Sequence, residues 1–206
     1  MNEKFFDLKK DKQDRMINGA LKVFAQNGYQ KASTDDIVKE AGISKGLLFH
    51  YFGSKAGTYI FVYEFSARFM SMEIERAVSL REKDLFILLE QVNEAKTELL
   101  RKYPYMEKFL LTHVDIKDET IQKAVSDHIN VIPKALSGII GRADSSRIID
   151  GVDFELLVRS MVYANRGLME TALMEGLDPD YVEKEAHAYY EMMRKQYTKP
   201  EYLLDI

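Results

Sequence analysis

The residues with the most specific chemistry lie in one short segment, TDDIVKEAGISKGLLFHYFGSK, from Thr34 to Lys55. A glycine separates two short helical patterns, and the second pattern begins with a lysine and carries several aromatic side chains. Lysines donate to guanine edges and to phosphates, and hydroxyls with free amides at a helix N-terminus bind anions. These residue types at this spacing favour a nucleic-acid contact.

Two short helices joined by a glycine-containing turn form a helix-turn-helix. Thr34 is expected to cap the first helix, Gly42 to end it, Ser44 to cap the second, and Ser54 to cap the long helix that follows. The apolar side chains expected to pack inward are Ile37, Ala41, Ile43, Leu48 and Phe52. This packing leaves the start and the outer side of the second helix free to enter a DNA major groove.

The exposed residue types suit particular DNA contacts. Lys45 could donate to guanine, Gly46 would let the backbone come close, and Leu47 suits a thymine methyl group. Tyr51 and Lys55 end in donors that can reach phosphates. The predicted DNA-binding residues are Thr34, Ser44, Lys45, Gly46, Leu47, Phe49, His50, Tyr51 and Lys55.

Residues 11–58 resemble the DNA-binding domain of TetR-type transcriptional regulators. The family signature runs approximately T-x-x-x-I-A-x-x-A-G-V-S-x-G-x-x-Y-x-[HY]-F-x-[ST]-K, and the preceding VFAQNGYQKAS also matches the family pattern. The resemblance covers about a quarter of the chain. Val38 replaces the usual alanine, and Phe49 replaces a commoner tyrosine and so lacks its hydroxyl. Gly57, early in the next helix, is expected to lower the stability of that helix by ~1 kcal/mol relative to alanine.

The rest of the chain also shows a period near 3.6, and no segment alternates as a strand would. Nine or so helices are predicted, over about 11–27, 34–42, 44–53, 55–80, 84–102, 106–114, 119–140, 153–175 and 179–197. Gly28 should stop the first helix, and Pro133 should kink or break the seventh. The predicted fold class is all-α. Residues 1–54 would form a three-helix helix-turn-helix domain, and the resemblance implies that residues 55–206 form a helical effector-binding and dimerisation domain.

The last two helices carry apolar side chains over more than one stripe, which is typical of helices buried on two sides. One side could pack on the body and the other on a second copy; a wholly intramolecular core is the alternative. The predicted dimer interface is Phe154, Leu157, Met161, Leu168, Leu173, Val182, Tyr189, Tyr190 and Met193. A dimer would present two recognition helices about one DNA turn apart, ~34–36 Å, to a near-palindromic site.

Bulky or polar residues on the body helices are candidates for an effector pocket. They are Tyr63, Phe69, Met70, Phe109, His113, His128, Tyr163, Arg166 and Met169. Methionine and aromatic stripes are equally typical of a core, and His113 and His128 also suit a core histidine with satisfied hydrogen bonds. Arg166 could meet a ligand carboxylate or an acidic side chain across a dimer. A pocket lined in this way would bind a largely apolar ligand.

The amino-acid composition excludes several other classes of protein. The 206 residues are 46% hydrophobic, enough for a packed core, and contain no cysteine, which excludes disulfides, thiolate catalysis and cysteine-ligated metals. The net charge of −4 divides into +3 for residues 1–58 and −7 for the rest, so the N-terminal part favours a polyanion. No signal peptide or membrane span is expected, which favours the cytoplasm. The four histidines are scattered, so we expect no metal and no cofactor.

These features together predict a dimeric, sequence-specific DNA-binding repressor, released from a near-palindromic operator by a small, largely apolar ligand. An activator or a corepressor-dependent regulator is the alternative, and nothing in the sequence separates these two from the repressor. Two remoter alternatives are an all-helical enzyme and an interaction module without DNA binding. The enzyme motifs H-E-x-x-H, G-x-G-x-x-G, G-x-x-x-x-G-K-[ST] and G-x-S-x-G do not occur.

Overall fold

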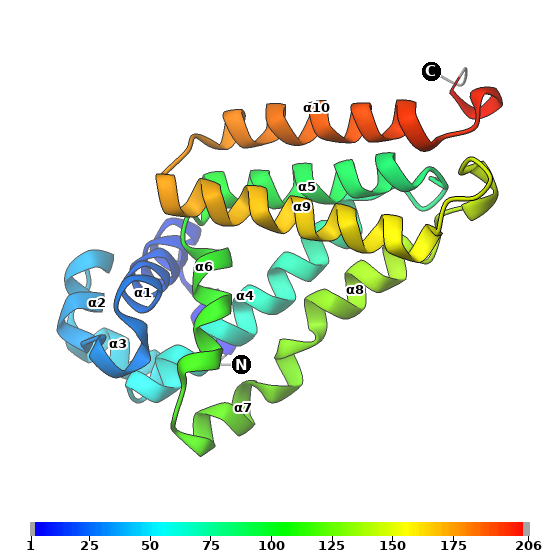
Figure 1. Cartoon of the computed structure of the whole chain (residues 1–206). Helices are drawn as coiled ribbons and strands as arrows, with labels where there is room; N and C mark the ends of the chain where they lie inside the picture. The colour runs from blue at the N-terminus through cyan, green and yellow to red at the C-terminus, as the bar shows by residue number, and fades with distance from the viewer. Residues whose placement is uncertain (1–2, 204–206) are drawn as a thin grey trace. The chain divides into compact units, whose positions relative to one another are not determined.

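The computed structural model describes residues 3–203, and its regular structure is helical (Figure 1). These residues contain no β-strand, only an isolated antiparallel bridge between Ile148 and Thr198. The all-α prediction is therefore confirmed. The α-helices are α1 (Lys10–Lys31), α2 (Thr34–Ala41), α3 (Lys45–Phe52), α4 (Lys55–Ala77), α5 (Leu85–Lys102), α6 (Met106–Leu111), α7 (Glu119–Ile129), α8 (Val131–Ile140), α9 (Phe154–Glu175) and α10 (Pro179–Tyr197). The short 3₁₀ helices are η1 (Glu3–Asp7), η2 (Thr112–Asp115), η3 (Ser145–Arg147) and η4 (Pro200–Tyr202).

The chain divides into two compact units. The first comprises Met1–Ser71 and Leu99–Pro133, and the second comprises Met72–Glu98 and Lys134–Ile206. Helices α4, α5 and α8 contribute residues to both units. The predicted domain boundary between residues 54 and 55 coincides with the start of α4, within the first unit, and it stays a prediction.

The long helix predicted over residues 119–140 forms two helices instead. Helices α7 and α8 meet at Asn130, not at Pro133. Pro133 is the third residue of α8, in the first turn, where a helix needs no amide N–H from the residue. The nine or so predicted helices thus become ten α-helices among the described residues.

Gly28 interrupts α1 without ending it. Its backbone angles, φ 66° and ψ 168°, lie outside the helical region, and the chain then turns once more to Lys31. A residue with a side chain rarely adopts this conformation. The predicted helix end is therefore a kink, which sets the last turn of α1 apart from the rest of the helix.

Helices α1 and α2 pack closely because small residues meet where the helices touch. A Cβ atom on Gly19 would lie 2.8 Å from the backbone nitrogen of Ala41, so the contact requires glycine. Further along α1, the Phe24 ring lies 5.1 Å from that of Tyr59 on α4 and 5.9 Å from that of Phe109 on α6, measured between centroids. These aromatic contacts hold the helix-turn-helix on the other helices of the first unit.

Gly57 allows the end of α3 to approach the start of α4. A Cβ atom at this position would lie 1.9 Å from the carbonyl oxygen of Phe52. The amide of Gly57 also donates to the Ser54 hydroxyl at 3.0 Å, which caps α4 as predicted. The predicted advantage of alanine at position 57 is therefore wrong, because alanine would collide with the backbone of Phe52.

The second unit has a core of its own, formed by α5, α9, α10 and the segment around Ile148. Its buried members are Leu85, Phe86, Leu89, Ile148, Leu157, Met161, Ala186 and Tyr190. Four predicted dimer residues, Leu157, Met161, Val182 and Tyr190, are buried within the single chain. Their helical positions direct these four side chains into the core of the single chain, and the predicted dimer interface stays a prediction. The other five, Phe154, Leu168, Leu173, Tyr189 and Met193, are half-buried.

The outer sides of α9 and α10 carry large apolar side chains in contact with solvent. Met174 is 87% exposed, Tyr163 69% and Leu156 56%, and their spacing of about two and three turns places them on one side of α9. Tyr181 and Met192 are the corresponding exposed residues of α10. We call these five exposed apolar residues the α9–α10 outer face.

A buried ion pair joins the start of α5 to the end of α10. The Nε atom of Arg194 donates to Oδ2 of Asp84 at 2.9 Å, and both side chains are buried. The other carboxylate oxygen of Asp84 accepts from the amides of Phe86 and Ile87 and so caps α5. Arg194 also donates to the carbonyl of Tyr202 at 3.2 Å. One buried contact therefore fixes α5, α10 and η4 together.

Replacing Arg194 with methionine should lower the free energy of unfolding by about 3–5 kcal/mol, because the Asp84 carboxylate would stay buried without its cation. Urea denaturation followed by circular dichroism measures the loss. Lys195→Met is the matched control. It removes an exposed ion pair with Glu191 and should change stability by about 0.5 kcal/mol or less. Equal losses in the two variants would contradict the role of Arg194.

Acidic side chains of α5 and α10 surround His187 in the second unit. A hydrogen bond from the Nδ1 atom to Oε1 of Glu90 raises the pKa of His187, and the charge of Glu90 adds to this. The pKa of Glu94 is also raised, first by burial and then by the negative charges of Glu90 and Glu183. Both groups therefore hold protons more tightly in the folded chain than in the unfolded chain.

The stability of the chain should consequently rise as pH falls through the raised folded pKa of His187 to its ordinary value of 6.5, because the folded state binds more protons in this range. The contribution of His187 is complete below its unfolded pKa and is lost as pH rises through its higher folded pKa. Urea midpoints measured across this range test the slope. His187→Gln should flatten it, although modestly, since the side chain is exposed. A slope unchanged in the variant would contradict this assignment.

Candidate nucleic-acid interface

Helix α3 has one buried side and one side turned to solvent. Ser44 caps it as predicted, its hydroxyl oxygen accepting from the amide of Leu47 at 3.2 Å. Leu48 and Phe52 are buried against the first unit, and Gly53 ends the helix. The local sequence therefore produces a two-turn helix that is fixed from within and open on its outer side.

The predicted DNA-binding residues lie at the surface of the first unit. Ser44, Lys45, Gly46, Phe49 and His50 are exposed, and Thr34, Leu47, Tyr51 and Lys55 are half-buried. None of the nine is buried in the core. A helix that reads a major groove needs its first turns accessible in this way.

The cap of α2 is Ser33, and the prediction that Thr34 caps this helix is wrong. The Ser33 hydroxyl oxygen accepts from the amide of Asp36 at 3.0 Å, and the hydroxyl donates to the Asp36 carboxylate at 2.6 Å. Thr34 is the first residue of α2. The spacing S-x-x-D was visible in the sequence as a capping box starting at Ser33.

Lys45 is held by a carboxylate of α2. Its ammonium group lies 2.8 and 3.0 Å from the two oxygens of Asp35, and both side chains are exposed. An exposed ion pair of this kind is worth little in water and exchanges readily. Lys45 can therefore turn to a base edge, but only by leaving Asp35. This partner lies ten residues earlier on a different helix, so the local sequence pattern did not predict it.

Lys55 points to the end of α1. Its ammonium group donates to the carbonyls of Tyr29 at 3.0 Å, Ala32 at 3.1 Å and Gln30 at 3.4 Å. It also lies 4.5 Å from the centroid of the Tyr29 ring. The carbonyls at a helix C-terminus lack helical partners and carry partial negative charge. The predicted phosphate contact of Lys55 stays a prediction, and in the free protein this lysine joins α4 to α1.

Six of the nine predicted pocket residues, Tyr63, Phe69, Met70, Phe109, His113 and His128, lie in the first unit. The ring centroid of Tyr63 lies 5.9 Å from that of Phe109 and 5.8 Å from that of His113. Burial raises the pKa of Tyr63 to about 12. The Nδ1 atom of His113 lies 2.8 Å from the carbonyl oxygen of Leu110, in hydrogen-bond contact. For His113 this geometry matches the alternative of a core histidine with a satisfied hydrogen bond.

Two of the other first-unit candidates lie beside further side chains of the same unit. Phe69 stacks on Phe65 with ring centroids 5.3 Å apart. His128 lies half-buried, with Nε2 3.9 Å from Oε1 of Glu64. No three histidine, aspartate or glutamate side chains among residues 3–203 are grouped as a metal site.

The remaining pocket candidates, Tyr163, Arg166 and Met169, belong to α9 in the second unit. Tyr163 is exposed, and Arg166 pairs with Glu170 one turn later at 2.7 Å. Met169 is buried. Six of the nine predicted pocket residues thus belong to the first unit and three to the second, and the predicted pocket stays a prediction.

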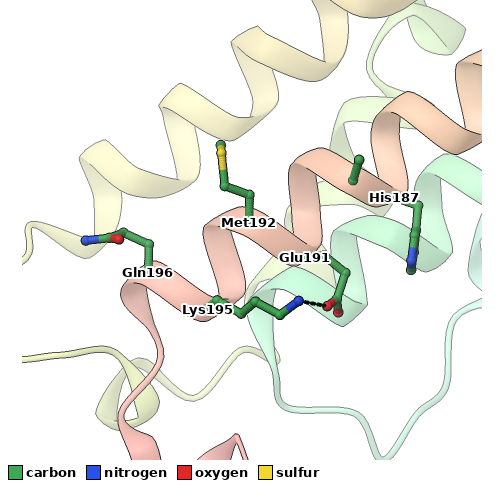
Figure 2. A pocket seen from close by; sticks show the side chains of 6 residues that line it. His187, Glu191, Met192, Lys195 and Gln196 are labelled. Carbon is green, nitrogen blue, oxygen red and sulfur yellow. Dashed lines mark ion pairs between the residues drawn. The ribbon is translucent and has the colours of Figure 1, made fainter.

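Two depressions lie along α10. Figure 2 shows the first, which is lined by His187, Ala188, Glu191, Met192, Lys195 and Gln196, all from α10 itself. It is an open stretch of helix surface, with the Glu191–Lys195 ion pair across it at 3.0 Å. The second, of about 180 Å³, lies between α9 and α10 and is lined by Ala164, Asn165, Leu168, Glu185, Ala186, Tyr189 and Tyr190.

The helix-turn-helix corresponds to a known family of DNA-binding proteins. Residues 16–57 match the family described as bacterial regulatory proteins, tetR family. This segment includes most of α1, all of α2 and α3, and the start of α4. This match identifies residues 16–57 as similar to the DNA-binding domain of TetR-family regulators. The resemblance predicted from the sequence is confirmed.

Two relatives of known sequence match a segment of 46 residues of this chain. The chain is 50% identical over 46 residues to the uncharacterized HTH-type transcriptional regulator YuxN of Bacillus subtilis, covering 22% of this chain and 16% of YuxN. It is 37% identical over 46 residues to IcaR of Staphylococcus aureus, a negative transcriptional regulator of the biofilm operon icaADBC, covering 25% of IcaR. The matched part therefore spans a quarter or less of these relatives.

Solved structures of transcriptional regulators share the fold over most of the chain. The regulator PfmR from Thermus thermophilus superposes with a TM-score of 0.61 at 23% identity, covering 86% of this chain and 96% of PfmR. FadR from Bacillus subtilis, solved in complex with stearoyl-CoA, gives a TM-score of 0.58 at 18% identity, covering 85% and 96%. At these identities the likeness shows the fold.

The contacts of Lys55 predict a loss of stability on mutation. Lys55→Met should lower the free energy of unfolding by about 1–3 kcal/mol, because three backbone carbonyls lose their charged donor. Thermal unfolding compared with Lys31→Met, an exposed lysine at the end of α1, measures the effect. A phosphate contact instead predicts that the salt dependence of DNA binding falls by about one unit. Normal stability with a lower salt slope would assign Lys55 to DNA and refute the structural role.

Proposed function

We propose that the protein is a sequence-specific DNA-binding transcriptional regulator that acts as a homodimer. The observation that carries this proposal is the exposed first turn of α3, with Ser44, Lys45 and Gly46 at the surface of a TetR-family helix-turn-helix. The naming of YuxN and IcaR as transcriptional regulators supports it.

In this proposal α3 enters the major groove with its N-terminus leading. Lys45 leaves Asp35 and donates to a guanine edge, Gly46 permits close approach, and Leu47 meets a thymine methyl group. The capped start of α3 at Ser44 and the hydroxyl of Tyr51 serve phosphates. Phosphate contacts fix the register, and the base contacts give the sequence preference.

The α9–α10 outer face is the proposed contact between two copies. Its apolar side chains Leu156, Tyr163 and Met192 lie in solvent in the single chain, and a second copy would bury them. Two helices from each copy would then form a four-helix contact. The half-buried Leu168 and Tyr189 would lie at its edge. This surface replaces the inward-facing part of the predicted interface.

The regulator is proposed to be a repressor released by a small, largely apolar effector. IcaR is a negative regulator and FadR was solved with stearoyl-CoA, so both features occur among similar proteins. Helix α4 begins directly after α3, and its C-terminal turns belong to the second unit. An effector that prefers one arrangement of α4 would shift DNA affinity by a coupling of ~1–3 kcal/mol.

An activator and a corepressor-dependent repressor use the same DNA contacts. Two measurements separate them from an inducible repressor. A reporter fused to the neighbouring promoter, with and without the gene, gives the sign of regulation. Titration of the bound duplex with a panel of apolar ligands that includes long-chain acyl-CoA gives the direction of the effector response. An affinity unchanged across the panel would argue against an inducer.

Lys45→Ala should weaken binding to a duplex selected from a random-sequence pool by about 5- to 150-fold and reduce the preference for guanine at one position. The exposed Lys39, in the last turn of α2, is the matched control, and Lys39→Ala should have a smaller effect without a change in sequence preference. Fluorescence anisotropy on the selected and base-substituted duplexes measures both. Equal effects of the two variants would exclude Lys45 from base reading.

The double variant Leu156→Glu, Met192→Glu should convert the dimer into monomers and weaken DNA binding, because charge would be buried between the copies. Size-exclusion chromatography with light scattering reports the mass. Met72→Glu, which adds a charge at an exposed methionine of α4, is the control and should remain dimeric. A double variant that keeps the dimer mass would place the contact elsewhere.

A further inference from the structure

The N-terminal segment η1 packs one of its aromatic rings beneath the end of the recognition helix. Phe5 is fully buried, and its ring centroid lies 5.9 Å from that of Tyr51 and 5.5 Å from that of Phe52, both on α3. It also lies 4.9 Å from the ring of Phe61 on α4, in an edge-to-face arrangement. One ring from outside the helix-turn-helix therefore touches both α3 and α4.

The segment that carries Phe5 is tied to the start of α1. The side-chain amide of Gln13 donates to the carbonyls of Phe6 at 3.0 Å and Leu8 at 2.7 Å. Gln13 is itself buried. Two bonds from a buried donor set the path of the backbone on both sides of Asp7. The position of Phe5 is thus defined by α1 and does not depend on α3 alone.

The recognition helix needs such support from outside. Helix α3 has eight residues, too few to be stable in isolation, so its position depends on what it packs against. Leu48 and Phe52 hold its inner side. Tyr51 is half-buried, and its ring contacts the ring of Phe5. Removing the Phe5 ring would leave a space under the last turn of α3, into which Tyr51 and Phe52 could move.

We propose that Phe5 is a positioning residue for DNA recognition: its ring holds Tyr51 and Phe52 against Phe61, so that η1 sets the placement of α3 relative to α4. The proposal rests on the proposed DNA-binding function. Phe5 itself is buried and makes no contact with DNA. It acts through Tyr51, whose hydroxyl is a predicted phosphate contact, and through the orientation of the whole helix.

A purely structural role makes a different prediction. If Phe5 only fills the core, its loss lowers the unfolding temperature but leaves α3 in place below that temperature. If Phe5 positions α3, its loss loosens α3 and weakens DNA binding under conditions in which the chain is folded. Amide hydrogen exchange separates these outcomes, because it reports local opening of α3 independently of global unfolding.

The test compares Phe5→Ala with Phe6→Ala. Phe6 is adjacent in the same segment and is 44% exposed. The affinity of each variant is measured for a duplex selected by the wild-type protein from a random-sequence pool, over a series of salt concentrations. Phe5→Ala should weaken binding about three- to tenfold, since two aromatic contacts with α3 are lost, and should leave the salt slope unchanged. Phe6→Ala should stay within about twofold of wild type.

Amide exchange measured by mass spectrometry completes the test. In Phe5→Ala, peptides covering α3 should exchange faster, while peptides covering α9 and α10 keep wild-type rates. Phe5→Leu, which restores most of the volume, should recover part of the affinity. It also replaces the alanine variant if the latter does not fold. Wild-type affinity and wild-type α3 exchange in a folded Phe5 variant would overturn the proposal.

The exchange measurement also distinguishes the failure of this inference from the failure of the proposed function. If the wild-type chain selects no duplex, the DNA-binding proposal fails, and with it the positioning role in recognition. Faster α3 exchange in Phe5→Ala would then show only that Phe5 supports the helix. If the wild-type chain binds a duplex and Phe5→Ala binds it equally well, the inference alone fails.

Discussion

The ammonium group of Lys55 makes the contact on which the helix-turn-helix depends most. It joins the first residue of α4 to three carbonyls at the end of α1, beyond the kink at Gly28. Helices α2 and α3 lie in the sequence between these two points. Closing this loop with a charged donor restricts both short helices, neither of which is long enough to be stable alone. A side chain that resembles a DNA contact in sequence thus also holds the domain together.

Charge in this domain is largely balanced by local pairs. The Nζ atom of Lys22 lies 2.6 Å from Oε1 of Glu40, and Lys45 pairs with Asp35. Carboxylates of α2 therefore neutralise two of the cations near the helix-turn-helix. The excess of +3 over residues 1–58 therefore overstates the charge available to attract DNA. In the proposed complex Lys45 would exchange the Asp35 carboxylate for a base or phosphate, so the free energy gained by this lysine would be the difference between two similar contacts.

The sequence predicted what depends on nearby residues and missed what depends on packing between helices. Ser44, Gly42 and Ser54 were predicted correctly because caps follow local rules. The sequence did not show that Leu157 and Tyr190 are buried within the single chain. An apolar stripe on a helix looks the same whether it packs in the chain's own core or against a partner. The nine DNA-contact candidates follow from local pattern and family resemblance and lie at the surface, whereas the partners of Lys45 and Lys55 lie 10 or more residues away. Gly57 was misjudged because the Phe52 carbonyl that requires it is set by tertiary geometry.

The close approach of Gly57 to Phe52 has a practical consequence for protein engineering. The first two turns of α4 are fitted to α3 at Gly57 and, through Phe61, to the ring of Phe52 4.8 Å away. A chimera that joined residues 1–54 to the C-terminal part of another protein would discard both contacts. A junction that keeps both contacts, and so transfers the helix-turn-helix intact, lies beyond Phe61, inside α4.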